Sequence, residues 1–195
     1  TRRLLRIAVR ETDRLNQLIT DFLHYARPGP AQPGAVALAA VAQEVIDVSG
    51  TVRPDSVRVS LRIPPELCVR ADEGQLRQLL WNLLLNAVQA MPEGGSLAIR
   101  AAEVPAQEPA AAGRNASKER VRWVEIEVED TGSGIPEDVL EHIFDPFFTT
   151  KKEGTGLGLA TVHRIVEGSG GHLAVESAVG RGTTFRIRLP RAEAV

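Results

Sequence analysis

The sequence predicts an α+β fold: a two-layer α/β sandwich with helices on one face of a mixed, mostly antiparallel sheet, preceded by one long helix. Three observations predict it. Residues 2–27 contain no Gly or Pro and place apolar side chains at helical spacing. From residue 36 onward, helical and strand patterns alternate between Gly- and Pro-containing turns. Val124, Ile126 and Val128 alternate with glutamates, so one sheet face needs a covering layer of helices.

The first 27 residues are predicted to form a helix that packs against other helices. A heptad seam is formed by Leu4, Ala8, Leu15, Leu18, Phe22 and Tyr25. Ile7, Ile19 and Leu23 widen the stripe to the width of a bundle helix, and we expect it to dock on another copy or on its own domain. Because Thr1 already lies in the helical pattern, we expect a fragment of a longer protein.

Proline and glycine residues between 28 and 34 end this helix. We therefore expect a linker at 28–35, a second domain at 36–190 and a tail at 191–195. In the second domain, Asp72 with Gln75 forms a capping-box pattern, which predicts a helix from there to about Met91. The other predicted elements are strands at 36–38, 57–61, 68–70, 97–101, 124–130, 172–177 and 183–189, and helices at 39–49 and 159–167. Residues 102–119, rich in Ala, Pro, Gly and Glu, are expected to be a disordered hairpin excursion.

Composition excludes several classes of protein. A net charge of −2 argues against a nucleic-acid binder. With Cys68 as the single cysteine there is neither a disulfide framework nor a zinc cluster, which favours a cytoplasmic location. No apolar run reaches the ~20 residues that span a bilayer, so we expect no membrane contact here, although an anchor of the parent protein could lie upstream.

Two amides stand out on the long predicted helix. Asn82 and Asn86 are four residues apart, so they share a face, although most of their neighbours are leucines. A buried amide without partners costs about 1–3 kcal/mol, so these residues need a reason. They could hold Mg²⁺ and phosphate oxygens, since Mg²⁺ prefers oxygen ligands. The alternative is solvent exposure or a structural bond to a loop.

Asp130 and two glycine-rich turns suggest a purine nucleotide site. Asp130 ends a predicted strand before Thr131-Gly132-Ser133-Gly134, and its carboxylate could accept a hydrogen bond from a base amino group. Residues Gly154–Gly158 open the next predicted helix, where free N–H groups bind phosphate. Lys151 and Lys152 could screen phosphate charge. Each feature has a structural alternative: an Asx turn, a helix start in a flexible loop, and solvated loop charge.

An aromatic patch at Phe144, Phe147 and Phe148 interrupts a chain in which aromatic residues are only 4% of the total. It could anchor a loop in the core, pin the base of a mobile lid, or do both.

Five motifs in order carry a specific resemblance. They are NLLLNA at 82–87, DTGSGI at 130–135, FDPFFTTK at 144–151, GTGLGLA at 154–160 and GRGTTF at 180–185. The series resembles the N box, first glycine box, F box, second glycine box and last glycine-threonine motif of sensor histidine kinases. The short lid is similar to that of the nitrogen-regulation and pilus-type kinases. The resemblance covers about 36–190 and implies the Bergerat-type ATP-binding fold of the GHKL superfamily. Residues 1–27 resemble the second helix of the dimerisation and histidine-phosphotransfer hairpin.

The resemblance implies a role for each matching residue. Asn82 would bind Mg²⁺, and Asn86 would bind the metal and phosphates, with Lys151 beside them as a third catalytic residue. Asp130 would bind the adenine amino group. The other implied ATP contacts are Gly132, Gly134, Ile135, Phe147, Gly154, Thr155, Gly156, Leu157, Gly158 and Thr183 or Thr184. The implied partners are a phosphoacceptor histidine domain of the same or sister subunit and a response regulator receiver domain, within a homodimer.

The N box also separates subgroups of the superfamily. Gyrase, Hsp90 and mismatch-repair ATPases carry a Glu where Asn82 stands, and an amide cannot act as a general base. The resemblance therefore favours phosphoryl transfer to a side chain over hydrolysis. A related ATPase or serine kinase, or a nucleotide-sensing dimerisation module without catalysis, remain the alternatives.

The phosphoacceptor motif of such kinases is missing. None of the histidines His24, His142, His163 and His172 is followed by Glu. His24 lies off the heptad seam, so we expect it on the surface. A basic residue seven positions after Asn82, found in some kinase subgroups, is Gln89 here, so phosphate charge must be met elsewhere, for which Lys151 and Lys152 are candidates. We therefore expect this chain to bind ATP and Mg²⁺ without phosphorylating itself.

Overall fold

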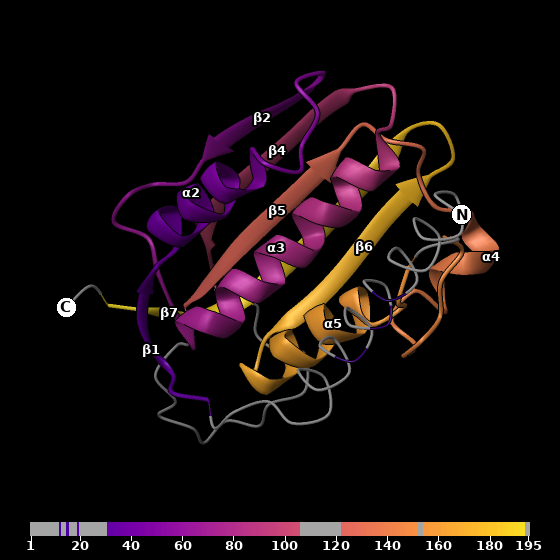
Figure 1. The fold of residues 1–195 in the computed structure, drawn as a ribbon. Helices are drawn as coiled ribbons and strands as arrows, with labels where there is room; N and C mark the ends of the chain where they lie inside the picture. Colours follow the sequence, from indigo (N-terminus) through magenta and orange to yellow (C-terminus); the bar gives the residue numbers. More distant parts are fainter. Residues whose placement is uncertain are drawn as a thin grey trace, which may run out of the picture.

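The computed structural model describes residues 12, 15, 19, 31–105, 122–151 and 154–193. Its elements, drawn in Figure 1, are β1 (Gly34–Ala37), α2 (Leu38–Ser49), β2 (Val57–Arg62), β3 (Cys68–Ala71), α3 (Glu73–Ala90), β4 (Gly95–Val104), β5 (Trp123–Asp130), α4 (Glu137–Leu140), α5 (Gly158–Gly168), β6 (His172–Ala178) and β7 (Gly182–Ala192). Asp72 caps α3 as predicted, because its carboxylate accepts the Gln75 N–H at 2.9 Å. Apart from residues 12, 15 and 19, the predicted N-terminal helix lies outside the described residues.

The strands form one seven-stranded sheet in the order β1-β3-β7-β5-β4-β2, with β6 also paired to β7. The pair β2–β4 is parallel, and the other strand pairs of the described chain are antiparallel. At 11 residues, β7 is long enough to pair with β6 through its first part and with β3 through its end. The predicted mixed, mostly antiparallel sheet is confirmed.

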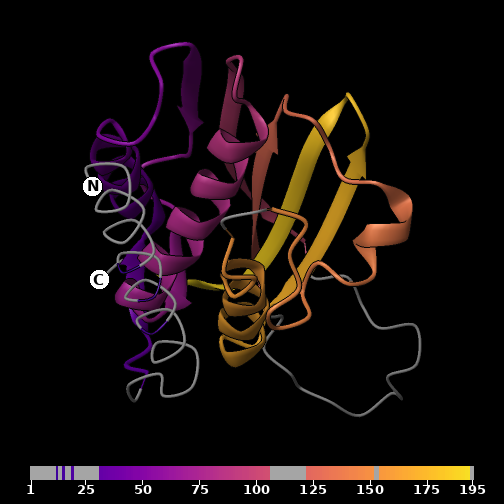
Figure 2. The same ribbon diagram turned by 45° about the vertical axis from the view of Figure 1, so that its right-hand side comes forward.

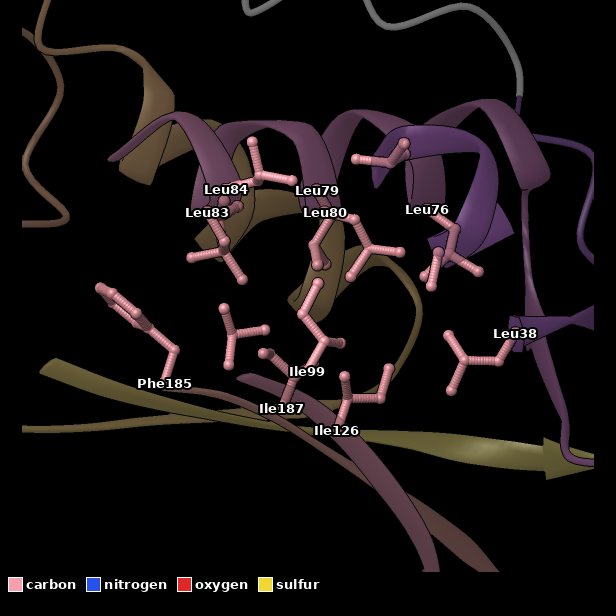
Figure 3. Close-up of a cluster of buried hydrophobic side chains, with 14 of the residues drawn as sticks. Leu38, Leu76, Leu79, Leu80, Leu83, Leu84, Ile99, Ile126, Phe185 and Ile187 are labelled. Carbon is pink, nitrogen blue, oxygen red and sulfur yellow. The ribbon is translucent and has the colours of Figure 1, made fainter. Parts of the chain in front are cut away.

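Helices α2, α3 and α5 cover one face of the sheet, and Figure 2 shows the two layers side by side. The central helix α3 points five buried leucines at the strands: Leu76, Leu79, Leu80, Leu83 and Leu84. Below them lie Ile99 of β4, Ile126 of β5, and Ile187 and Phe185 of β7 (Figure 3). Burying each such side chain contributes about 1.5–3 kcal/mol, so this interface fixes α3 on the sheet.

The opposite sheet face carries alternating charges. Arg100 contacts Glu127 at 2.7 Å and Glu129 at 2.6 Å, and Arg188 contacts Glu125 at 2.7 Å. Exposed pairs of this kind contribute roughly 0–1 kcal/mol each. The charged side chains of this face pair with one another, so the face can stay in water. The other face forms the core and the site.

Several elements differ from the prediction. β4 continues to Val104, into the stretch expected to be disordered, because Val104 pairs with Trp123; residues 106–121 lie outside the described chain. β7 runs past the expected domain end at 190, because Arg191 and Ala192 pair with β3. β1 starts inside the expected linker, where Gly34 pairs with Ala71. The short helix α4 was not predicted, since it buries no side chain and has no apolar period to detect.

Candidate functional site

A cavity of about 1010 Å³ opens between α3, α5 and the ends of β5 and β7. It brings together residues from all five sequence motifs. Of the candidates, those that line it are Asn82, Asn86, Asp130, Gly134, Ile135, Lys151, Gly154, Thr155, Gly156, Gly158 and Thr183. Of the other candidates, Gly132, Phe147, Leu157 and Thr184 are not among its lining residues.

Asp130 reaches the cavity because of strand alternation. Along β5 the residues on the inner face are Val124, Ile126, Val128 and Asp130, so the carboxylate takes the next core position at the strand end, where the side chain is 6% exposed. Burial raises its pKa above the usual 3.8, while N–H donors of Gly132 and Thr183 and the charge of Lys151 oppose that rise. Gly132 N–H donates to Asp130 Oδ1 at 2.8 Å. The carboxylate is thus held in a fixed orientation, with acceptor capacity left for a ligand.

Thr183 and Thr184 point to opposite faces of β7. Thr183 pairs in register with Asp130, is 4% exposed and lines the cavity. Thr184 pairs with Glu129 and lies on the charged outer face. The sequence left the choice between the two threonines open, and the geometry puts only Thr183 against the cavity.

Asn82 and Asn86 form the wall of the cavity on α3. Both are half-buried, on the edge of the helix between its leucine face and the cavity. The start of α5 lies against them: a Cβ added to Gly158 would meet Asn82 Oδ1 at 3.8 Å and Asn86 Nδ2 at 3.9 Å. These are ordinary van der Waals distances, so the start of α5 lies directly against the two amides. The N-terminus of α5 has no side-chain cap, which leaves its first N–H groups directed at the same space.

Lys151 brings a positive charge to the cavity wall. Its Nζ donates to Asn86 Oδ1 at 2.8 Å and to Gln89 Oε1 at 2.6 Å. Partial burial lowers the pKa of the ammonium group, and attraction to Asp130 opposes that change. The ammonium of Lys151 thus lies beside Gln89 of α3, the position at which some kinase subgroups carry a basic residue. Lys152, the other basic candidate, lies outside the described residues.

The glycines shape the cavity through their backbone. Gly134 has a φ of +70°, and a Cβ there would lie 2.0 Å from the Ala178 carbonyl oxygen. Gly156 has a φ of +69°, and a Cβ would lie 2.4 Å from the carbonyl carbon of Phe147. At Gly132 the constraint is packing, since an added Cβ would lie 2.7 Å from the Cβ of Ala90.

The phenylalanines of the aromatic patch divide between core and surface. Phe144 packs against the core beside His163, with ring centroids 5.4 Å apart, and Phe148 lines the cavity. Phe147 is 58% exposed, and its N–H donates to the Gly156 carbonyl at 3.0 Å, which ties the two motifs together. Leu157 is buried at the start of α5. Both the core-anchor and the lid interpretations of the patch are thus compatible with its packing.

Two residues that hold side chains of the site in place were not among the candidates from the sequence. Gln89 accepts a hydrogen bond from Lys151. Gln89 lies three residues after Asn86 on α3, and this spacing could have indicated that the two share a face. Ser177 accepts the Ile135 N–H at 2.8 Å and lies 2.9 Å from the Thr183 hydroxyl. Nothing in the sequence distinguishes Ser177 from an ordinary strand residue, because its partners come from two other segments.

The donor chemistry limits what metal the site can hold. The described residues contain no group of three or more His, Cys, Asp or Glu side chains placed for a metal ion. A hard ion that accepts amide and phosphate oxygens, such as Mg²⁺, fits a wall made of Asn82 and Asn86.

None of the described helices has the length and apolar character needed to cross a membrane.

Comparison with known proteins identifies relatives of this chain. Residues 71–193 match the family described as histidine kinase-, DNA gyrase B-, and HSP90-like ATPase. The chain is 51% identical over 125 residues to the sensor kinase CckA of Brucella abortus, covering 63% of this chain and 13% of that protein. It is 37% identical over 192 residues to the sensor histidine kinase ZraS of Escherichia coli K12, covering 96% of this chain and 37% of ZraS. The chain therefore spans well under half the length of these relatives.

Solved structures agree in fold. Full-length ShkA in complex with AMPPNP superimposes with a TM-score of 0.77 at 28% identity, covering 99% of this chain and 39% of that one. The catalytic domain of histidine kinase ThkA gives 0.67 at 29% identity, covering 82% and 96%. With the cavity, its motif residues and these matches in agreement, this chain belongs to the family of histidine kinase-, DNA gyrase B- and HSP90-like ATPases.

Proposed function

We propose that this chain is the ATP-binding catalytic domain of a sensor histidine kinase. It transfers the γ-phosphoryl group of ATP to a histidine of a dimerisation domain, for relay to an aspartate of a response regulator. The observation that carries this proposal is that one cavity combines a buried carboxylate at the end of β5, a wall of amides on α3, and Lys151, which contacts that wall from the loop before α5. A carboxylate suits a base amino group, and amides with a cation suit a metal-bound triphosphate.

The base end of the pocket is assigned to Asp130, Thr183 and Ile135, with Gly134 providing close backbone approach. The triphosphate end is assigned to residues Gly154–Gly158 and the N-terminus of α5, where N–H groups and the helix dipole favour phosphate. Asn82 and Asn86 would hold Mg²⁺, which when bound neutralises phosphate charge during transfer. Lys151 adds a positive charge at the same wall.

Phosphoryl transfer is favoured over hydrolysis by what the cavity lacks. Among the described lining residues, the carboxylates are Glu44 and Asp130. Glu44 is paired with Arg77 at 2.9 Å, and Asp130 is held by Gly132 N–H. Asn82 stands in the N box and has no basic atom, so this part of the chain offers no general base for an attacking water.

The acceptor histidine is proposed to lie in another segment or chain. Of the described histidines, His142 contacts Asp145 at 2.9 Å, while the rings of His163 and His172 pack at a tilt beside Phe144 and Trp123 respectively. None of the three lines the cavity. His24 lies outside the described residues. We assign 1–27 to the dimerisation and phosphotransfer helix and 28–33 to the linker. The catalytic domain takes 34–192, because β1 and the end of β7 both belong to the sheet, in a parent protein that acts as a homodimer at the cytoplasmic side.

One experiment tests this function. The 195-residue chain is titrated with ATP and Mg²⁺ and then mixed with a separate histidine-bearing hairpin and radiolabelled ATP. We expect saturable binding, transfer of label to the hairpin, and no label on the chain alone. Asp130→Asn should abolish transfer, and Ser60→Ala, on the exposed edge strand β2, should not alter it. Steady phosphate release without hairpin labelling, or binding without transfer, would contradict the kinase assignment.

A further inference from the structure

Ser177, near the end of β6, connects three parts of the pocket wall. Its Oγ accepts the Ile135 N–H at 2.8 Å, donates to the Gly182 carbonyl at 3.0 Å and lies 2.9 Å from Thr183 Oγ1. Ile135 and Thr183 both line the cavity, whereas Ser177 does not. Ser177 therefore acts on the pocket only through its neighbours.

The count of hydrogen atoms decides the direction of these bonds. A serine hydroxyl has one hydrogen to donate and two lone pairs that accept. The Gly182 carbonyl can only accept, and the Ile135 N–H can only donate. The Ser177 hydrogen is used on Gly182, so the bond between Ser177 and Thr183 must be donated by the Thr183 hydroxyl.

Thr183 consequently has no hydrogen left for a ligand. Thr183 is buried and lines the cavity, so a ligand that reaches its hydroxyl oxygen there meets lone pairs only. Its register partner Asp130 likewise presents carboxylate oxygens, so this edge of the pocket consists of acceptors. A purine 6-amino group carries two N–H donors and matches such an edge, whereas a 6-oxo group offers only lone pairs and opposes it.

We infer that Ser177 is a positioning residue: it fixes the Thr183 hydroxyl as an acceptor and thereby makes the pocket select 6-amino over 6-oxo purine nucleotides. This inference rests on the proposed ATP-binding function and adds to it the residue that sets base discrimination. In a purely structural role, Ser177 would hold the turn at Gly182 and affect all nucleotides alike.

The test measures the affinities of the 195-residue chain for ATP and for inosine triphosphate, which carries a 6-oxo group. In Ser177→Ala the Thr183 hydroxyl is released and can turn its hydrogen toward a 6-oxo group. One net hydrogen bond corresponds to roughly a five- to tenfold change, so the ratio of ATP to inosine triphosphate affinity should fall by about that factor. Ser177→Thr keeps the hydroxyl and should retain the ratio. Ser60→Ala, a serine on exposed β2, is the matched control and should retain it too.

An equal loss of both nucleotides in Ser177→Ala, with the ratio unchanged, would overturn the inference and leave ATP binding intact. If Ser177→Ala does not fold, Thr183→Val tests the acceptor on which the inference depends. The valine removes the acceptor at nearly constant volume, so ATP should weaken and inosine triphosphate should not, and an unchanged ratio would again overturn the inference. Failure of the unaltered chain to bind either nucleotide would refute the proposed function and this inference together.

Discussion

Replacing Lys151 tests whether this lysine neutralises the negative charge of the triphosphate. The Lys151 ammonium reaches Asn86 and Gln89 from the loop that precedes α5, so it brings to α3 a charge that the helix itself lacks at position 89. If this charge contacts the triphosphate, Lys151→Ala should weaken ATP binding and slow transfer. If the lysine is ordinary loop charge, the substitution should change neither.

The expected size follows from the contacts. A unit charge about 4 Å from a phosphate oxygen is worth about 4 kcal/mol at an effective dielectric constant near 20. Lys151 is partly solvated and gives up its bonds to Asn86 and Gln89 to engage a ligand, which reduces the net value to that of a charged hydrogen bond, about 1.5–3 kcal/mol. Lys151→Ala should therefore reduce ATP affinity or the transfer rate roughly 10- to 150-fold.

A second substitution makes this test specific. Gln89 accepts from Lys151 Nζ at 2.6 Å, so an arginine at position 89 can place its own charge in the same space. In the Lys151→Ala background, Gln89→Arg should recover a large part of the lost activity. Arg58→Ala, which removes one positive charge on exposed β2, controls for net charge. The assays are nucleotide titration and labelling of the separate hairpin. A Lys151→Ala chain within twofold of the unaltered one, or no recovery by Gln89→Arg, would refute the reasoning.

Three further outcomes follow from the structure. Because burial raises the pKa of Asp130 above 3.8, the stability cost of its ionised form builds up as the pH rises from 3.8 to that raised value and is complete above it. The unaltered chain should therefore gain stability relative to Asp130→Asn as the pH falls from 7 to 4. A loss of stability relative to Asp130→Asn over this range, measured by denaturant unfolding at each pH, would contradict this. Leu83→Ala should lower the free energy of unfolding by about 2–5 kcal/mol, since Leu83 is 1% exposed in the core, against less than about 0.5 kcal/mol for Val179→Ala at a 69% exposed position, both read from urea unfolding. Gly156→Ala should leave the core folded but weaken ATP in a titration, because the added Cβ lies 2.4 Å from the Phe147 carbonyl carbon and the loop must shift; unchanged affinity would show that this loop does not shape the site.

The pattern of the strands contained information on the site that the glycine motifs did not. Alternation along β5 already put Asp130 on the same face as Ile126 and Val128, because successive strand residues point to opposite faces whatever the rest of the chain does. The same rule on β7 would have separated Thr183 from Thr184 had the strand been extended from Phe185 and Ile187 on the buried face. Local periodicity fixes which face a residue occupies.

Pairing between distant segments was not predictable in this way. Lys151 was a candidate for the charge missing at position 89, but no local pattern indicates that it contacts Gln89, 62 positions away. The contact between Ser177 and Ile135, 42 positions apart, was equally hidden. Strand ends extended further than composition indicated, because cross-strand partners such as Trp123 for Val104 supply hydrogen bonds that local composition does not reveal.

The sequence by itself determined the class of this protein: the layers of its fold, the capped helix that carries Asn82 and Asn86, and the five motifs that indicate a nucleotide pocket. Only the tertiary structure decided which atoms meet. In the folded chain the Lys151 ammonium contacts α3, and Thr183 rather than Thr184 lines the cavity. The bonds around Ser177 determine the direction of its hydrogen bond with Thr183. The physical reason is that periodicity and turn chemistry act between neighbours in the chain, whereas charge placement and hydrogen-bond direction depend on groups that folding brings together.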